Sequence, residues 1–264
     1  MPFSLGAIIA LLTQKGARIF DIETEKATLL DVLEIMTIEK KVKIFPLGDN
    51  ALTVSFGGEI SLELNNLVLK LAQFFDQNQF PGLVEIVPAY ASLSIFYDVL
   101  TVRRNFPEFS TAFSAVKNFV ENALQNLNEI TKSNPRLIKI PMSFEKEFAP
   151  DLEFVALTNK LTPKEVIEIF IAPTYRVYML GFLPGFAYMG EVDDRINTPR
   201  KQAPRFKVPK GSVGIAGKQT GIYSLASPGG WQIIGKTDTE LFTPEAETPT
   251  FLQAGDLVKF YAVN

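Results

Sequence analysis

Residues 175–231 read YRVYMLGFLPGFAYMGEVDDRINTPRKQAPRFKVPKGSVGIAGKQTGIYSLASPGGW. Glycine and proline recur throughout this stretch, and apolar residues persist between them. Short apolar runs separated by such turn residues are typical of a β-barrel or sandwich. Basic side chains stand next to the turns, at positions 195, 200, 205, 207 and 210. The stretch therefore predicts short strands and shaped loops that together build a cleft.

Two residue types are absent from the 264-residue chain, cysteine and histidine. Without cysteine, disulfides, thiolate metal sites and cysteine nucleophiles are excluded. Without histidine, Ser–His–Asp triads, most zinc sites and the usual general base near neutral pH are excluded as well. We therefore expect no metal site in this chain, and chemistry carried by carboxylates, lysine, arginine, hydroxyls and backbone amides.

Composition is that of an ordinary globular protein, with 47% apolar and 21% charged residues and 22 phenylalanines. The net charge of −3 argues against nucleic-acid binding. No apolar run reaches the roughly 18 residues of a membrane span. The N-terminus has no basic residue before its apolar core and no clear cleavage site, so it does not resemble a signal peptide. We expect a cytoplasmic protein.

The first 41 residues fit the rest poorly because their periodicity is weak. A second methionine, Met36, stands just ahead of a clear strand signal. One hypothesis is that the native chain starts at Met36 and that residues 1–35 are an upstream extension. The alternative is a helical arm. We therefore divide the chain into an N-terminal extension (1–41), an α+β domain (42–135) and a β domain with a helical lead-in (136–264).

In residues 42–135, strands alternate with helices. Apolar residues alternate over 52–56, as in a half-buried strand, and Ser61 is a plausible N-cap of a following helix. Further strands are predicted at 84–87 and 91–97, with a second helix from about Pro107. Two helices on a four- or five-stranded sheet form an α+β layer arrangement.

Beyond this region a strand over 136–142 is expected to complete the first unit. Asp151 can cap a short helix, and the run 162–165, TPKE, is a capping box with proline at the first helical position. After Pro173 only short strands and turns follow, which predicts a barrel-like β domain. The last strand, 258–263, is expected to close it.

The run Gly181–Phe186 contains the dipeptide Pro184-Gly185. Proline followed by glycine favours a type II turn, in which glycine takes the positive φ. We expect the flanking rings of Phe182 and Phe186 to anchor this turn in the core. The run is then either a structural corner or part of a binding site.

Two proline–arginine pairs, Pro199-Arg200 and Pro204-Arg205, follow a few residues later. The arginine fork binds carboxylate or phosphate bidentately, and a preceding proline stiffens its backbone. These arginines predict a site for a small anionic substrate. The alternative is a surface ion pair with the acidic residues at 191, 193 and 194.

The glycine-rich run 208–223 leaves room for a ligand or for another backbone. It is not a Walker-type phosphate loop, because Ser212 stands where that motif needs glycine and Gln219 follows Lys218. Binding of ATP in another mode stays open. The single tryptophan, Trp231, is either a core residue or an apolar wall for a flat substrate.

We predict that neutral and basic side chains of this region bind the substrate, and that Lys210 and two of the arginines are candidates for charge stabilisation in catalysis. The predicted substrate-binding residues are Pro184, Gly185, Phe186, Arg200, Arg205, Ser212, Gln219, Tyr223 and Trp231; the catalytic candidates are Lys210, Arg200 and Arg205. The catalytic residues themselves stay unknown.

The runs GFLPGFAYMG, TPR, APR, VPKGSVGIAGKQTGIY and SPGGW resemble the allophanate hydrolase subunit 1 family, and the resemblance covers about residues 42–264. This family includes the B subunit of bacterial ATP-dependent 5-oxoprolinase and an inhibitor of a sporulation sensor kinase. The resemblance implies an α+β N-terminal domain followed by a mostly β, cyclophilin-like barrel domain.

The resemblance also implies a function shared between chains. With a homologous C subunit (subunit 2) and an A subunit, such a chain would open 5-oxoproline to L-glutamate, with ATP and Mg²⁺ held by the complex, and would be inactive alone. The alternative is a binding module that inhibits a sensor histidine kinase; a weaker one is an allophanate hydrolase or urea amidolyase-related subunit. One departure from the family pattern is Phe170, where a histidine is usual, and this change either removes activity or is absorbed by packing.

Overall fold

The computed structural model describes residues 42–127 and 134–263. The described residues from Ile44 onward belong to one compact unit. The hypotheses of a native start at Met36 and of a helical arm lie outside the described residues, and the boundary at 135/136 stays a prediction. Across the described residues, no helix combines the length and the apolar character that crossing a membrane requires.

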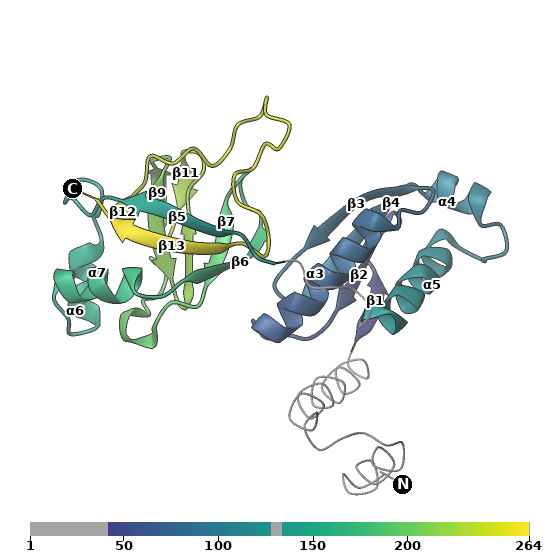
Figure 1. Cartoon of the computed structure of the whole chain (residues 1–264), viewed down its shortest axis with the longest axis horizontal. Helices are drawn as coiled ribbons and strands as arrows, with labels where there is room; N and C mark the ends of the chain where they lie inside the picture. The colour runs from purple at the N-terminus through teal and green to yellow at the C-terminus, as the bar shows by residue number, and fades with distance from the viewer. Residues whose placement is uncertain (1–41, 128–133, 264) are drawn as a thin grey trace, which may run out of the picture. The chain divides into compact units, whose positions relative to one another are not determined.

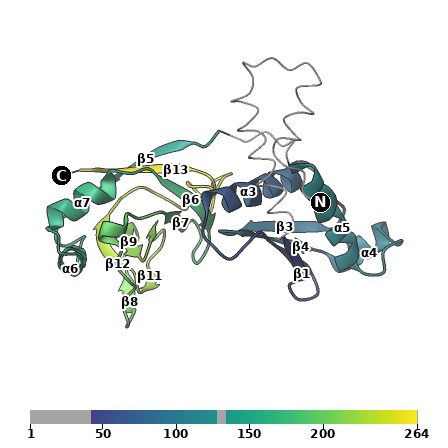
Figure 2. The same cartoon turned by 90° about the horizontal axis from the view of Figure 1, so that it is seen from below.

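A four-stranded sheet carries the first part of the fold, in the order β1-β2-β4-β3. Its strands are β1 (Lys43–Pro46), β2 (Ala51–Ser55), β3 (Leu83–Pro88) and β4 (Ser92–Tyr97). Helix α3 (Leu62–Gln77) packs on β3 and β4, and α5 (Ala112–Gln125) packs on β2; Figure 2 shows both helices on one face of this sheet. Ser61 caps α3 as predicted, because its hydroxyl accepts a hydrogen bond from the Leu64 amide at 3.2 Å.

The helix predicted from about Pro107 begins only at Ala112, and a short helix ahead of Pro107 was not predicted. Helix α4 (Val99–Asn105) is capped by Asp98, and α5 starts only after Thr111, which forms a capping box with Ser114. Pro107 lies in the turn between them. The helix start was predicted too early because Phe109 and the apolar residues after it recur at helical spacing. Such local periodicity does not show where the chain turns before the helix begins.

A seven-stranded sheet forms the second part, in the order β12-β9-β10-β7-β6-β13-β5 (Figure 1). Its strands are β5 (Leu137–Met142), β6 (Tyr175–Leu180), β7 (Ala187–Gly190), β9 (Ser212–Ala216), β10 (Gln219–Ile222), β12 (Gln232–Lys236) and β13 (Leu257–Ala262). A two-stranded ribbon pairs β8 (Arg205–Val208) with β11 (Ser227–Gly229), and the short helix η3 spans Asp194–Ile196. Helices α6 (Leu152–Thr158) and α7 (Pro163–Ile171) pack on β12 and β13, respectively.

The two edges of this sheet meet at Ser143 and Lys236. The Ser143 amide donates to the Lys236 carbonyl at 2.8 Å, and the Lys236 amide donates to the Ser143 carbonyl at 3.0 Å. These bonds bring the end of β5 to the end of β12, so the sheet is barrel-like. The predicted fold class, an α+β part followed by a mostly β, barrel-like part, is confirmed.

Two strand assignments were wrong. The strand predicted at 136–142 does not complete the first sheet; it is β5, an edge strand of the second. The last strand, β13, does not close the barrel; it lies inside the sheet, antiparallel to β6 and parallel to β5 from Leu257–Leu137 to Ala262–Met142. Parallel pairing joins segments far apart in sequence, so the local pattern of either strand cannot reveal it.

Asp151 does not cap α6, contrary to the prediction. Its side chain makes no capping bond, and its carboxylate, 4% exposed, instead accepts three hydrogen bonds. The donors are the Ile233 amide at 2.6 Å, the Arg205 Nη2 at 2.5 Å and the Lys201 Nζ at 3.3 Å. This carboxylate therefore ties the start of α6 to β12 and to the segment that enters β8.

Helix α7 begins as predicted, with Thr162 and Glu165 in a capping box and proline at its first turn. At its end, Phe170 is fully buried, and its ring lies 5.3 Å from that of Tyr175 and 5.2 Å from that of Phe260. Its carbonyl accepts a hydrogen bond from the Tyr175 hydroxyl at 2.7 Å. Phe170 is thus a core residue, which supports the interpretation that packing absorbs this departure from the family pattern.

We expect Asp151→Ala to lower the free energy of unfolding by about 3 kcal/mol, since it leaves the Arg205 guanidinium and the Ile233 amide without their acceptor. The matched control is Asp194→Ala. The Asp194 carboxylate pairs with Lys218 at 2.9 Å but is 74% exposed, so its loss should cost less than about 1 kcal/mol. Urea unfolding of both variants measures the difference, and equal losses would contradict the role given to Asp151.

Stability should also fall at alkaline pH through Tyr175. Burial, with a smaller effect of Asp193, raises the pKa of its phenol above the ordinary value. Above a pH of about 10 the unfolded chain releases a proton that the folded protein retains, so stability present below that pH declines as the pH rises further. Unfolding measured from pH 8 to 11 should show a shallower decline in Tyr175→Phe, and an unchanged decline would refute this assignment.

Candidate functional site

An aromatic pocket of about 420 Å³ lies in the barrel-like part of the fold. Five rings line it, together with one charged side chain, Arg200, and one side-chain amide, Gln219. The rings are those of Phe182, Phe186, Tyr188, Tyr223 and Trp231. Apolar walls with a few polar groups are typical of a small-ligand site.

Phe186 is the central ring of this pocket. Its centroid lies 4.8 Å from that of Tyr188, 5.4 Å from that of Tyr223 and 5.5 Å from that of Trp231, in edge-to-face geometry. Each such pair contributes about 0.5–1.5 kcal/mol beyond the burial of its surface. Gly221 permits this packing, because a Cβ there would lie 2.7 Å from Phe186 Cζ. The room expected at this glycine is therefore taken by the protein's own ring and not by a ligand.

The turn before Phe186 sets the position of its ring. The Phe186 amide donates to the Leu183 carbonyl at 3.0 Å, and Gly185 between them has a φ of +75°. Proline followed by a glycine with positive φ is the arrangement predicted for a type II turn. Phe182, by contrast, was wrongly predicted to be buried: it is 59% exposed and touches Phe186 edge-on from the rim.

Arg200 is held by its backbone neighbours while its side chain stays uncommitted. The side-chain amide of Gln232 donates to the Pro199 carbonyl at 2.9 Å, and the backbone amide of Lys201 donates to the Gly230 carbonyl at 2.7 Å. Among residues 42–127 and 134–263, the Arg200 guanidinium has no hydrogen-bond or ion-pair partner. The pocket therefore offers one free cation on a firmly placed segment.

The charge of Arg200 acts on two phenols of the same pocket. Burial raises the pKa of Tyr188 and of Tyr223, and the nearby guanidinium partly offsets the rise in both. Both hydroxyls therefore stay protonated at neutral pH and can donate hydrogen bonds to a ligand.

The structure brings together five of the predicted substrate-binding residues: Phe186, Arg200, Gln219, Tyr223 and Trp231. Sequence reasoning missed Tyr188, although it lies two residues after Phe186 and so on the same side of an extended chain. Period-two alternation along 186–190 was the signal that could have identified it.

The other predicted residues lie elsewhere. Arg205 is bonded to Asp151 and, with Ser212, lines a separate cavity of about 280 Å³. Lys210 forms an exposed ion pair with Glu240 at 2.7 Å. Pro184 and Gly185 belong to the turn that carries Phe186, and the Pro184 carbonyl accepts a hydrogen bond from Ser224 at 2.6 Å. The roles predicted for all of these residues remain predictions.

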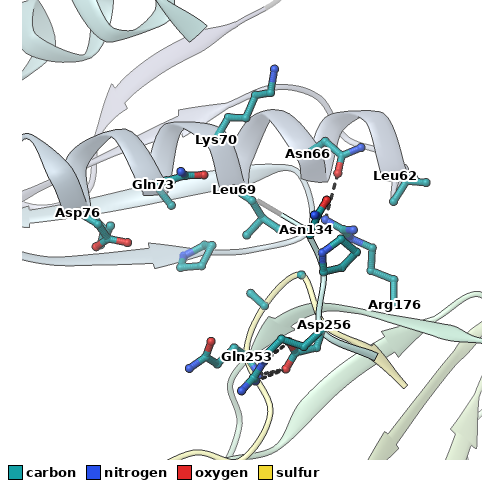
Figure 3. Close-up of a pocket in the computed structure, with 17 residues that line it drawn as sticks. Leu62, Asn66, Leu69, Lys70, Gln73, Asp76, Asn134, Arg176, Gln253 and Asp256 are labelled. Atoms are coloured by element: carbon teal, nitrogen blue, oxygen red, sulfur yellow. Dashed lines mark hydrogen bonds and ion pairs between the residues drawn. The ribbon is translucent and has the colours of Figure 1, made fainter. Parts of the chain in front are cut away.

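A larger cavity of about 690 Å³ is lined by α3 and by residues near β13 (Figure 3). Its arginines already have protein partners. Arg136 donates to both Asp256 oxygens, at 2.8 and 2.5 Å, and Arg176 donates to Asn66 at 3.0 Å. The aromatic pocket combines its uncommitted cation with a wall of rings, which makes it the stronger candidate for a flat anion.

The aromatic pocket can bind and orient, but the residues that line it include no carboxylate or lysine to transfer a proton. No group of three metal-ligating side chains occurs among the residues that the structure describes. The geometry thus suits recognition of a small, flat anion whose reaction needs further groups.

Phe186→Ala should lower the free energy of unfolding by about 3–5 kcal/mol, because it empties the centre of the aromatic cluster. Phe182→Ala in the same turn is the control and should cost less than about 1 kcal/mol, since that ring is mostly exposed. Thermal unfolding of the pair tests this order, and a larger loss for Phe182→Ala would reverse our interpretation of the turn.

Known proteins resemble this chain over most of its length. Residues 42–252 match the family model described as carboxyltransferase domain, subdomain C and D. A protein from Bacillus subtilis, named as the B subunit of 5-oxoprolinase, is 45% identical over 87% of this chain and 95% of its own. One of the same name from Haemophilus influenzae is 36% identical, over 83% of this chain and 97% of its own.

A solved structure agrees in fold. The crystal structure of TTHA0988 superposes with a TM-score of 0.68 at 34% identity and covers 81% of this chain. The present chain spans only 40% of the TTHA0988 chain. In that relative, a fold of this kind is therefore part of a longer polypeptide.

Proposed function

The chain belongs to the carboxyltransferase domain family, subdomains C and D, and from this membership we propose that it is a substrate-binding subunit of an ATP-dependent 5-oxoprolinase. Relatives at 45% and 36% identity, matched over nearly their whole length, are named as the B subunit of 5-oxoprolinase. The observation that carries the proposal is the unpartnered guanidinium of Arg200 at an aromatic pocket in the described part of the chain.

The chemistry of 5-oxoproline suits this pocket. The molecule is a five-membered lactam ring with one carboxylate, and a guanidinium fork binds a carboxylate bidentately. In the proposal, Arg200 holds the carboxylate, and the ring lies against Trp231 and Phe186. The Gln219 amide, with a donor and an acceptor, matches the C=O and N–H of the lactam. Binding then orients the lactam for attack.

The opening of the ring needs partners in this proposal. Transfer of the γ-phosphoryl group of ATP to the lactam oxygen activates the ring carbon, and water then adds to it. Breaking of the C–N bond leaves an acyl phosphate, which a second water hydrolyses to L-glutamate and phosphate, with ADP as the other product. Since the pocket lining offers no carboxylate or lysine, we assign the ATP–Mg²⁺ and the acid–base groups to the complex with the A and C subunits.

Reconstitution tests the proposal directly. The chain is combined with the A and C subunits, and consumption of ATP and 5-oxoproline is measured together. Arg200→Gln should raise KM for 5-oxoproline between about 10- and 100-fold, the effect of losing a charged hydrogen bond. The control is Arg195→Gln, because Arg195 is paired with Asp193 on the surface and does not line the pocket; it should leave KM unchanged.

Turnover that does not depend on this chain would overturn the proposal. If the chain in that case blocked autophosphorylation of a sensor kinase, the alternative of a protein-binding inhibitor would replace it. Equal effects of Arg200→Gln and Arg195→Gln would remove Arg200 from the site without removing the chain from the complex.

A further inference from the structure

A cavity separate from the aromatic pocket collects basic side chains. It measures about 280 Å³, and its lining includes Arg205 and Lys207 of β8, Ser212 of β9 and Lys236 of β12. The lining also includes the aromatic ring of Phe148 and the carboxylate of Glu147. Three cations and one carboxylate therefore face a space of this size.

The three cations differ in what already binds them. Lys207 has no hydrogen-bond or ion-pair partner among residues 42–127 and 134–263. Lys236 pairs at 3.0 Å with Asp238, which is 92% exposed, and its Nζ lies 4.9 Å from the centre of the Phe148 ring. Arg205 is bonded to Asp151. Exposed pairs contribute little, so both lysines remain available to a ligand.

Ser212 contributes a hydroxyl to the lining of this cavity. It is only 3% exposed, and its backbone is bonded, the amide to the Pro209 carbonyl at 3.3 Å and the carbonyl to the Tyr223 amide at 2.9 Å. Its hydroxyl, however, has no partner within the described part of the chain. A hydroxyl that lines a cavity and has no protein partner can donate a hydrogen bond to an anion bound there.

We propose that this cavity binds a phosphate group, either of a nucleotide or of free phosphate. The inference rests on the proposed function in one respect, since that function makes ATP a co-substrate. The donors come from three strands, so they can surround a tetrahedral anion. A planar carboxylate needs less, because a single arginine fork can bind it bidentately. A volume of about 280 Å³ exceeds the roughly 30 Å³ of a water several-fold, which leaves room for phosphoryl groups.

The cavity and the aromatic pocket are adjacent along two segments. In the first segment, Pro204 lines the aromatic pocket and its neighbour Arg205 lines this cavity. In the second, Trp231 lines the aromatic pocket and Ile233 lines this cavity. Arg205 Nη1 also lies 3.4 Å from the Trp231 carbonyl. A phosphate in this cavity would therefore lie beside the same two segments that shape the aromatic pocket.

Titration calorimetry of the full chain tests the inference, with inorganic phosphate, ATP and acetate as separate ligands at constant ionic strength. Phosphate or ATP should bind, and acetate should not. Lys207→Ala and Ser212→Ala should each raise the Kd by about tenfold, as expected for the loss of one hydrogen bond to a charged ligand. The control Lys210→Ala removes an exposed lysine that pairs with Glu240 and does not line the cavity; its Kd should not change.

Glu147→Gln should change the Kd for phosphate in the direction opposite to that of Lys207→Ala and Ser212→Ala. Removing the one carboxylate of the lining should tighten phosphate binding several-fold, and weaker binding would contradict the site. Tighter binding of ATP than of phosphate assigns the site to a nucleotide, and equal binding assigns it to free phosphate.

Absence of phosphate and ATP binding would overturn the inference, as would equal weakening by Lys207→Ala and Lys210→Ala, because general surface charge would then account for it. The result is separate from that of the proposed function. Arg200 does not line this cavity, and phosphate binding by the chain alone does not depend on turnover of the complex.

Discussion

The buried carboxylate of Asp151 organises the segment that shapes both cavities. It accepts hydrogen bonds from Lys201, Arg205 and the Ile233 amide, so it joins the start of α6 to β12 and to the chain entering β8. A buried carboxylate is stable only where such donors surround it. Within the described part of the chain, the same interaction engages two of the three cations in 200–205 and leaves Arg200 free.

The barrel-like sheet supplies the rigid support for this arrangement. Its edges meet through Ser143 and Lys236, so β12, which carries Ile233, is held on both sides. The aromatic pocket depends on the turn that places Phe186 among three other rings. Both cavities are therefore built on tightly packed elements. The groups at them that lack a partner among the described residues, the guanidinium of Arg200 and the ammonium of Lys207, project from exposed positions.

Local signals in the sequence predicted local structure well. Ser61 and Thr162 cap helices as expected, and Gly185 takes a positive φ, because each of these depends on residues within one turn. Predictions that depended on distant partners were less reliable. The strand at 136–142 belongs to the second sheet through its parallel pairing with β13, and Phe182 lies at the rim, where more than half of its surface stays exposed.

The sequence by itself excluded histidine and cysteine chemistry, marked the turns and identified the two proline–arginine pairs as candidates for binding an anion. It could not distinguish the two pairs, since Arg200 and Arg205 have the same local context. Only the tertiary structure decided between them. Asp151, 54 residues before Arg205, binds that guanidinium and not the other, so Arg205 became part of the framework and Arg200 remained available to a ligand. The reason is physical: the groups that folding brings near a charged side chain decide whether it forms an ion pair within the protein, and its neighbours in sequence do not.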